Sequence, residues 1–534
     1  MKSHSILFLT TMLFLVGCAS VPTPAPAPAP APTPTKTDVS GEKVNMLVIQ
    51  ADQGKDIISR DIYGHFSEHL GRCIYEGFWV GPDSPIPNTD GIRNDVVAAL
   101  RKLDIPLLRW PGGCFADEYH WKDGIGPRNK RPARLNTHWG MITETNAFGT
   151  HEFMQLCEML GCDAYIAGNV GSGTPEEMMD WVEYLTCGED TAMTRLRKEN
   201  GREKPWQVKY FGVGNENWGC GGEMTPEYYA DVFKRYQKFV WRYPDSKLQK
   251  VACGPGSDDI NWTEVVFSKA NRFMDAFSLH HYVFSGNWND KGRATEFSEE
   301  QWFKTLKQTL FADELIRKNE TVMDKYDPQK RVALAVDEWG TWWNAEGGGN
   351  PGFLYQQNTL RDAVVAGTFL NIFNSHADRV RMACIAQTNN VLQAMILTKG
   401  DKMIVTPTYY VFEMYKVHQG ATLLPSKLEC SPYQLDNKTL QSLNVSASKD
   451  KQGVIHISLC NLDPQKPTKL ECELTGITAK KVSGRVLTSE TMNAHNTFEQ
   501  PNAIEPVEFK DVEIKDGKIL ATLPAKSVVV LTVE

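Results

Sequence analysis

The sequence predicts an α/β protein in which a (β/α)8 TIM barrel is followed by a C-terminal all-β sandwich. Its 534 residues are enough for one large barrel and a further domain. Hydrophobic residues make up 41% and charged residues 23%, the composition of a soluble globular protein. From about residue 57 to 415 the chain repeats a short apolar run, a Gly- or Asn-rich turn and a longer amphipathic stretch, which is the pattern of βα units.

The N-terminal residues predict export. An apolar run over residues 6–16 is too short to span a membrane, and it ends in Gly17-Cys18, which resembles a bacterial lipobox. We therefore expect residues 1–17 to be a lipoprotein signal peptide and Cys18 to carry lipid. The protein would be a periplasmic or cell-surface lipoprotein whose only link to the membrane is that anchor. An ordinary secretory signal with an incidental cysteine is the alternative. Residues 18–42 are rich in Pro, Ala and Thr, which favours an extended linker.

Residues 57–415 are predicted to form the barrel. Stretches such as 95–103 and 226–240 have apolar residues at helical spacing and would supply the outer helices. Eight short apolar runs, the number of strands in a closed barrel, end near residues 65–68, 107–110, 164–167, 210–213, 251–253, 277–280, 332–336 and 381–386.

Residues 416–534 are predicted to form the β-sandwich, because the pattern there changes to short alternating strands such as 453–460 and 526–533. Residues 43–56 precede the first barrel strand. We expect them to add a strand to the sandwich.

Charge and cysteine usage exclude several partners. The formal net charge is −8 without a long block of either sign, which disfavours nucleic acid as a partner. Of the 12 cysteines, those other than Cys18 are scattered without a C-x-x-C pair. They indicate neither a disulfide framework nor a zinc site, and we expect most of them to be buried free thiols.

Two glutamates mark the candidate chemistry. Glu216 follows the fourth predicted strand and Glu338 the seventh, and the loops after the strands carry the active sites of such barrels. A carboxylate beside an apolar strand is costly unless it is used. Two carboxyl groups facing each other across a cleft are what glycosidic bond cleavage requires. The alternative is that each glutamate caps a helix or pairs with an arginine of the barrel.

Seven motifs in the same order resemble glycoside hydrolase family 51, which is known mainly for α-L-arabinofuranosidases. The resemblance runs from about residue 45 to the C-terminus. The motifs are Tyr63–His69, Leu108–Phe115, Trp121–Pro127, Gly214–Glu216, Leu279–Tyr282, Asp337–Trp339 and Ala386–Asn389.

The resemblance implies a retaining mechanism with Glu338 as nucleophile and Glu216 as acid/base. Asn215 can donate a hydrogen bond to the sugar 2-hydroxyl, and Arg109 can stabilise the charge of Glu338. Cys114 stands where many family members have Asn, which puts the substrate subtype in question more than the chemistry. The residues implied to line the furanose subsite are Glu68, Arg109, Asn215, His280, Tyr282 and Gln387.

We expect an exo-acting α-L-arabinofuranosidase that removes terminal arabinofuranosyl groups from arabinose-containing oligo- or polysaccharides such as arabinan and arabinoxylan. One alternative keeps the mechanism and takes β-xylosides or β-1,4-glucans. Another is a glycan-binding lipoprotein without chemistry. No cofactor and no metal are expected, because His280-His281 lacks a third ligand at sensible spacing. A homo-oligomer is an expectation from the resemblance alone.

The segment 339–343 contains three tryptophans directly after the seventh predicted strand. These rings either shape the subsites for the leaving group or seal the top of the barrel. The sequence leaves both alternatives open.

Overall fold

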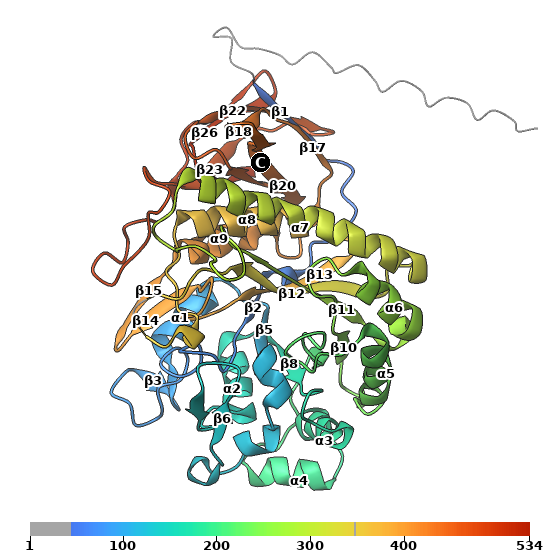
Figure 1. The fold of residues 1–534 in the computed structure, drawn as a ribbon. Coiled ribbons are helices and arrows are strands. Elements are labelled where there is room, and N and C mark those ends of the chain that lie inside the picture. The colour runs from blue at the N-terminus through green and yellow to red at the C-terminus, as the bar shows by residue number, and fades with distance from the viewer. Residues whose placement is uncertain (1–43, 347–348) are drawn as a thin grey trace, which may run out of the picture.

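The computed structural model describes residues 44–346 and 349–534. The expected signal peptide, Cys18 and the whole of the expected linker lie outside these described residues. The described chain forms a barrel and a strand-rich C-terminal domain that lie on opposite sides of a layer of helices (Figure 1). Within the described ranges, no helix combines the length and the apolar character needed to cross a membrane.

The barrel is closed by eight parallel strands, as predicted. Each strand pairs with its two neighbours in chain order, and the last pairs with the first. Their carboxyl ends therefore meet at one rim, where the chemistry of such barrels lies. The strands are β2 (Gly64–Phe66), β5 (Leu107–Trp110), β8 (Asp163–Gly168), β9 (Tyr210–Val213), β10 (Gln249–Ala252), β11 (Ala276–Val283), β12 (Ala333–Thr341) and β13 (Val380–Ala386).

The helices begin at sequence signals that are readable in advance. Thr225 caps α5 by accepting from the amide of Tyr228, and Pro226 occupies the first turn. This helix ends at Gln237, whereas the apolar pattern predicted it through residue 240. The pattern extends further than the helix because the loop after it also buries an apolar residue, Val240. The helices are α1 (Asn94–Lys102), α2 (Thr150–Leu160), α3 (Pro175–Thr186), α4 (Ala192–Glu199), α5 (Pro226–Gln237), α6 (Ile260–Ala270), α7 (Glu299–Tyr326), α8 (Leu360–Ser375) and α9 (Pro407–Tyr415).

The C-terminal domain contains two sheets with a shared apolar core. One sheet has the order β17 (Ser426–Glu429), β1 (Asn45–Gln50), β22 (Thr468–Thr475), β26 (Lys518–Leu523) and β25 (Val512–Lys515). The other has the order β16 (Thr422–Leu423), β20 (Leu443–Lys449), β21 (Ile455–Asn461), β27 (Ser527–Val533), β23 (Val482–Leu487) and β24 (Val507–Glu508). β1 pairs in parallel with β22 and antiparallel with β17, and its alternate residues Leu47 and Ile49 are buried in the core.

Short two-stranded ribbons complete the described structure. They are β3 (Asn88–Thr89) with β4 (Ile92–Arg93), β6 (Arg134–Asn136) with β7 (Ile142–Glu144), β14 (Ile396–Lys399) with β15 (Lys402–Val405), and β18 (Pro432–Leu435) with β19 (Lys438–Gln441).

Helix α8 joins the two domains. It is buried along its whole length except at its last residue, because it contacts β12 and β13 of the barrel on one side and β20, β21 and β27 of the sandwich on the other. A helix with apolar residues on all sides is typical of such a position, and the few polar residues of α8, such as Asp362, are hydrogen-bonded where they are buried. Polar contacts also join it to the C-terminal domain: the Ser458 hydroxyl donates to Oδ1 of Asn371 at 2.7 Å, and the amide of Leu360 donates to the carbonyl of Ala494 at 2.9 Å.

Candidate active site

A cavity of about 620 Å³ lies at the carboxyl ends of the barrel strands. Of the residues predicted for the site, six line it: Glu68, Glu216, His280, Tyr282, Glu338 and Gln387. Of the other two, Arg109 donates to Glu338 and to Asn215, so Asn215 is linked to the lining residues through Arg109. The barrel thus brings all eight predicted side chains together.

Glu338 lies within β12 rather than after it. The pairing of β12 shifts register between Val336 and Trp339, and such an irregularity lets consecutive side chains point to the same side of a sheet. Arg109 donates to Oε1 of Glu338 at 2.8 Å, and the Tyr282 hydroxyl donates to Oε2 at 2.8 Å. Both donors favour the ionised carboxylate.

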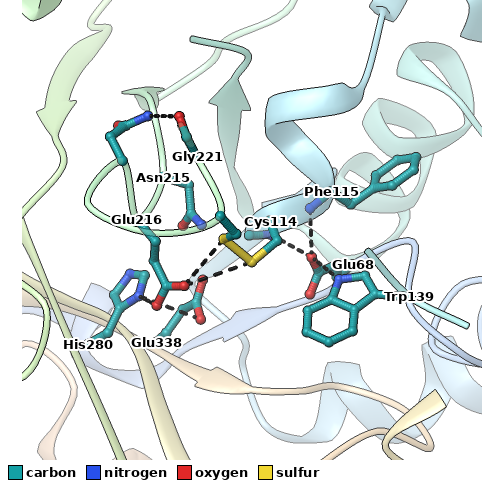
Figure 2. The surroundings of a disulfide bond; sticks show 12 residues. Glu68, Cys114, Phe115, Trp139, Asn215, Glu216, Gly221, His280 and Glu338 are labelled. Carbon is teal, nitrogen blue, oxygen red and sulfur yellow. Dashed lines mark hydrogen bonds and ion pairs between the residues drawn. A yellow bond between two sulfur atoms is a disulfide. The ribbon is translucent and has the colours of Figure 1, made fainter. Parts of the chain in front are cut away.

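Glu216 reaches the cavity from the loop after β9. Its backbone is left-handed, with φ of 41°, a conformation that costs a non-glycine residue free energy and is common at functional sites. Oε1 lies 2.8 Å from Nδ1 of His280, and Oε2 lies beside two sulfur atoms (Figure 2). Single acceptor atoms of Glu216, His280 and Glu338 all lie within 4.8 Å of one another.

His280 lies among three carboxyl groups. Besides Glu216, its Nδ1 is 3.6 Å from Oε2 of Glu338, and its Nε2 is 3.3 Å from Asp337. Burial alone would lower the pKa of His280, but the charge of Glu338 and the contacts with Asp337 and Glu216 raise it to about 10. His280 is therefore a cation at neutral pH, which balances part of the negative charge of the site.

Asn215 offers a free donor to the cavity side of the site. Its Oδ1 accepts from Nη2 of Arg109 at 2.6 Å, which fixes the amide orientation. Its Nδ2 is buried and has no hydrogen-bond partner among the described residues. A buried unpaired donor is costly unless a ligand satisfies it. Gly113 has no side chain that would fill the space beside Glu338 and Asn215. A Cβ there would lie 2.6 Å from Oε1 of Glu338.

Glu68 closes the opposite side of the cavity. Its Oε1 accepts from the amides of Gly113 and Phe115 and from Nε1 of Trp139, and its Oε2 accepts from Gln387 at 3.0 Å. Burial, and then the charge of Glu338, raise the pKa of Glu68 to about 7 even though these donors lower it. Oε1 of Gln387 has no partner among the described residues and remains available to a ligand.

A disulfide between Cys114 and Cys220 corrects the expectation from cysteine spacing. The two residues are 106 positions apart, so no local motif announces the bond, and the barrel alone brings the loops after β5 and β9 together. Of the described cysteines, the remaining nine are free, and most of them are buried, as expected. Cys114 therefore lines the cavity as half of a disulfide, not as a thiol that replaces an amide.

Aromatic side chains surround the cavity mouth. Trp342 lines the cavity, whereas Trp339 and Trp343 are buried. The segment therefore contributes both to the cavity wall and to the packing at the top of the barrel. Trp288 lies 5.3 Å from Trp342 and is 62% exposed. Sequence reasoning missed it, because an exposed tryptophan in a loop has no pattern of its own. Trp139 and Trp218 also line the cavity and were missed for the same reason.

Two groups of side chains in the described part of the chain have the spacing of metal ligands, and both include Glu216. In the first, Cys114 and Cys220 are bonded to each other and offer no thiolate. In the second, Nδ1 of His280 already lies 2.8 Å from Glu216 and 3.6 Å from Glu338.

Comparison with known proteins gives the same picture over most of the chain. The models of an "alpha-L-arabinofuranosidase 1 domain" and an "alpha-L-arabinofuranosidase C-terminal domain" match residues 99–293 and 337–527. An intracellular exo-α-L-arabinofuranosidase from Bacteroides ovatus is 51% identical over 93% of this chain and 97% of its own. The α-L-arabinofuranosidase C of Emericella nidulans is 32% identical over 82% of this chain and 89% of its own.

Solved structures are similar as well. The GH51 arabinofuranosidase of Xanthomonas axonopodis pv. citri has a TM-score of 0.91 and 51% identity, and the match covers 92% of this chain and 100% of that one. The α-L-arabinofuranosidase of Thermotoga maritima, solved with arabinose, has a TM-score of 0.81 and 31% identity over the same shares.

The expectation of an exported lipoprotein was wrong on these comparisons. The Bacteroides ovatus relative, which matches almost the whole chain, is named an intracellular enzyme. The expectation rested on residues 1–18 alone, a short apolar run with a Gly-Cys pair that carries no information about the folded enzyme. The periplasmic or cell-surface location and the lipid anchor at Cys18 are therefore withdrawn.

Proposed function

The chain belongs to the α-L-arabinofuranosidases of glycoside hydrolase family 51, and from this we propose that it is an exo-acting, retaining enzyme that works by double displacement. The observation that carries the proposal is the close approach of Glu216 and Glu338, which have oxygen atoms within 4.8 Å of each other. Retaining glycosidases hold their two carboxyl groups about 5 Å apart, whereas inverting enzymes leave about 6.5–9.5 Å for a water molecule.

In the first step the Glu338 carboxylate attacks the anomeric carbon of the furanose. A bond forms between that carbon and Glu338 as the glycosidic bond breaks, and Glu216 gives its proton to the departing oxygen. In the second step Glu216 takes a proton from water, the resulting hydroxide attacks the same carbon, and Glu338 leaves. Two inversions give net retention of configuration.

The surroundings of the two glutamates support these different roles. Glu338 has two donors, Arg109 and Tyr282, that stabilise a negative charge, as a nucleophile requires. The side chain of Glu216 is 19% exposed against 8% for Glu338, and it lies nearer to the solvent from which the second-step water comes. Asn215 supports a glycoside at this site, because its free Nδ2 can bind the 2-hydroxyl of the sugar, where hydrogen bonds strengthen in the transition state.

The closed floor of the cavity supports exo action. Glu68 and Gln387 are almost fully buried and are joined by a hydrogen bond from Gln387 to Glu68, so we expect that a substrate cannot extend past them. A terminal sugar unit fits this end, while the exposed ring of Trp288 at the mouth can stack on sugars of the leaving group. We propose arabinan and arabinoxylan fragments as substrates.

Azide rescue of the full-length chain tests the two roles separately. On 4-nitrophenyl α-L-arabinofuranoside, Glu338→Ala should be nearly inactive, and azide should restore turnover with β-L-arabinofuranosyl azide as product. Glu216→Ala with azide should give the α-azide, because the covalent intermediate still forms with a good leaving group. The same azide anomer from both variants, or wild-type activity in either, would contradict the assignment.

The alternative substrates are tested on the wild-type enzyme. 4-Nitrophenyl β-D-xyloside and β-D-glucoside should be turned over far more slowly than the arabinofuranoside. A preference for either of them would favour the β-xyloside or glucan alternative over arabinofuranosyl release.

A further inference from the structure

The Cys114–Cys220 disulfide joins the two loops that frame the cavity. Cys114 opens a short 3-10 helix, Cys114–Glu118, directly after β5, and Cys220 lies in the loop that carries Glu216 after β9 (Figure 2). Both cysteines line the cavity, and neither is fully buried. The bond therefore forms part of the wall that a substrate meets.

The disulfide contacts one oxygen of the Glu216 carboxyl. Oε2 of Glu216 lies 3.5 Å from Sγ of Cys220 and 3.8 Å from Sγ of Cys114, and Oε1 is held by His280. A disulfide sulfur carries no proton, so these two contacts are packing contacts. Within the described part of the chain, Oε2 has no conventional N–H or O–H donor. The disulfide thus limits where Oε2 can lie without binding it.

Cys220 is also built into the turn that sets the backbone of Glu216. The carbonyl of Glu216 accepts from the amides of Gly219 at 2.8 Å and Gly221 at 3.1 Å, the two neighbours of Cys220. Asn217 closes the turn by donating to the carbonyl of Gly221 at 2.8 Å. A left-handed residue such as Glu216 persists only where its surroundings fix it. A covalent link from Cys220 to the loop after β5 fixes this turn to the barrel.

We propose that the Cys114–Cys220 disulfide is a positioning element for the acid/base Glu216, so that reduction of the bond weakens proton transfer to the leaving group. The proposal rests on the role given to Glu216 above. In the reduction, a thiolate of dithiothreitol attacks one sulfur, and its second thiol releases the mixed disulfide. Cys114 and Cys220 each end with one S–H, and the reagent becomes a cyclic disulfide. The new thiols are weak donors to Oε2, and the turn loses its covalent tie.

The leaving group separates a positioning role from a merely structural one. General-acid assistance matters most when the departing oxygen is a poor leaving group, and it hardly matters for a strongly acidic phenol. We therefore expect reduction to lower kcat/KM about tenfold or more on phenyl α-L-arabinofuranoside and less than about twofold on the 2,4-dinitrophenyl glycoside. Reoxidation should restore both values.

The experiment compares the oxidised and reduced full-length enzyme on these two substrates, with mass spectrometry of alkylated protein to establish that the bond is reduced. The Cys114→Ser/Cys220→Ser variant should behave like the reduced enzyme and should not respond to dithiothreitol. Cys430→Ser, which changes a free cysteine in the sandwich, is the matched control and should respond as the wild type does. Circular dichroism and the thermal midpoint establish that each protein is folded.

An equal loss on both substrates, or no loss after proven reduction, would overturn the proposal. Glu216→Ala is measured in parallel to separate this failure from that of the proposed function. If Glu216 is the acid/base, that variant shows a strong dependence on the leaving group whether or not the disulfide matters. If Glu216→Ala loses activity equally on both substrates, the role of Glu216 itself is wrong, and the proposal falls with it.

Discussion

Nδ1 of His280 lies 2.8 Å from Oε1 of Glu216, so the glutamate expected to transfer protons is paired with a buried cation. The same ring lies 3.6 Å from Glu338 and 3.3 Å from Asp337. Several carboxyl groups this close repel one another unless a positive charge lies between them. Together with Arg109, His280 makes it possible to keep Glu216 and Glu338 within reach of one sugar carbon.

The charge of His280 predicts how the stability of the protein depends on pH. The pKa of His280 is raised to about 10 from 6.5, so its contribution to the free energy of unfolding is fully present below about pH 6.5 and is lost as the pH rises towards 10. The thermal midpoint of the wild type should therefore fall more steeply over this window than that of His280→Gln. Scanning calorimetry at about pH 6, 8 and 10 measures the difference.

His376→Gln is the matched control for this prediction. Burial would lower the pKa of His376, but Asp313 and Glu320 raise it to about 9, far from the cavity. That variant should also flatten the curve while leaving kcat unchanged. Parallel curves for the wild type and His280→Gln would show that the histidine is not protonated in the folded enzyme.

Glu68 should make the folded protein less stable as its carboxyl ionises. Burial and the charge of Glu338 raise its pKa to about 7 from 4.5, so the unfolded state ionises first, and stability falls as the pH rises from 4.5 through 7. The shift corresponds to a cost on the order of 3 kcal/mol above pH 7. Glu68→Gln should flatten the fall of the thermal midpoint over this range while raising KM for the arabinofuranoside.

Glu144→Gln serves as the control, because ionisation of Glu144 should raise the stability of the folded protein where ionisation of Glu68 lowers it. Although burial opposes it, His69 holds the pKa of Glu144 below its ordinary value, so its stabilisation is present at neutral pH and lost on acidification. If Glu68→Gln and the wild type lose stability equally between about pH 5 and 8, Glu68 is already ionised at low pH.

Removal of the free amide of Asn215 should lower the rate more than the affinity. Asn215→Ala is expected to reduce kcat about 100-fold with little change in KM, because contacts to the 2-hydroxyl strengthen as the sugar approaches an oxocarbenium ion. With a 2-deoxy aryl arabinofuranoside, wild type and variant should differ by less than about threefold, since the contact is then absent from both. An undiminished difference on the 2-deoxy substrate would place the role of Asn215 elsewhere, on Arg109 for example.

Trp288 should matter for long substrates only. Trp288→Ala is expected to raise KM about tenfold for arabinoxylan oligosaccharides through the loss of stacking at the cavity mouth. KM for 4-nitrophenyl α-L-arabinofuranoside should stay the same. Trp241→Ala is the control, because Trp241 is 52% exposed and does not line the cavity. Equal effects of Trp288→Ala on both substrates would argue against a leaving-group contact.

The sequence predicted the barrel well because each strand is a short apolar run bounded by turn residues. It also predicted Glu216 and Glu338 as a pair from their positions at strand ends, where a carboxylate is costly unless it is used, and both side chains line the same cavity. It did not foresee that the register shift in β12 makes Asp337 and Glu338 both face inward, because irregular pairing depends on the neighbouring strands. The helical pattern through Val240 overstated the length of α5, because Val240 is buried from the loop that follows the helix.

The sequence could not predict the contacts between segments that lie far apart along the chain. Cys114 and Cys220 look like any pair of scattered cysteines until the barrel closes. Trp139 donates to Glu68 from a loop with no recognisable motif. His280 lines the cavity, where the resemblance places a sugar contact, but nothing in the sequence indicated the carboxyl groups of Glu216 and Asp337 that lie against it. Which side chains meet at the rim is decided by strand order and stagger.

The placement of β1 has a consequence for synthesis on the ribosome. Met46 in β1 pairs with Glu429, so about 380 further residues must be translated before the partner of this strand has been made. At the usual pace of translation that interval is roughly 20 to 80 seconds. The barrel can be completed during this time, whereas the sandwich closes only when the last strands emerge. A nascent chain therefore carries β1 unpaired until β17 and β22 have been made, and an unpaired apolar strand is prone to aggregate.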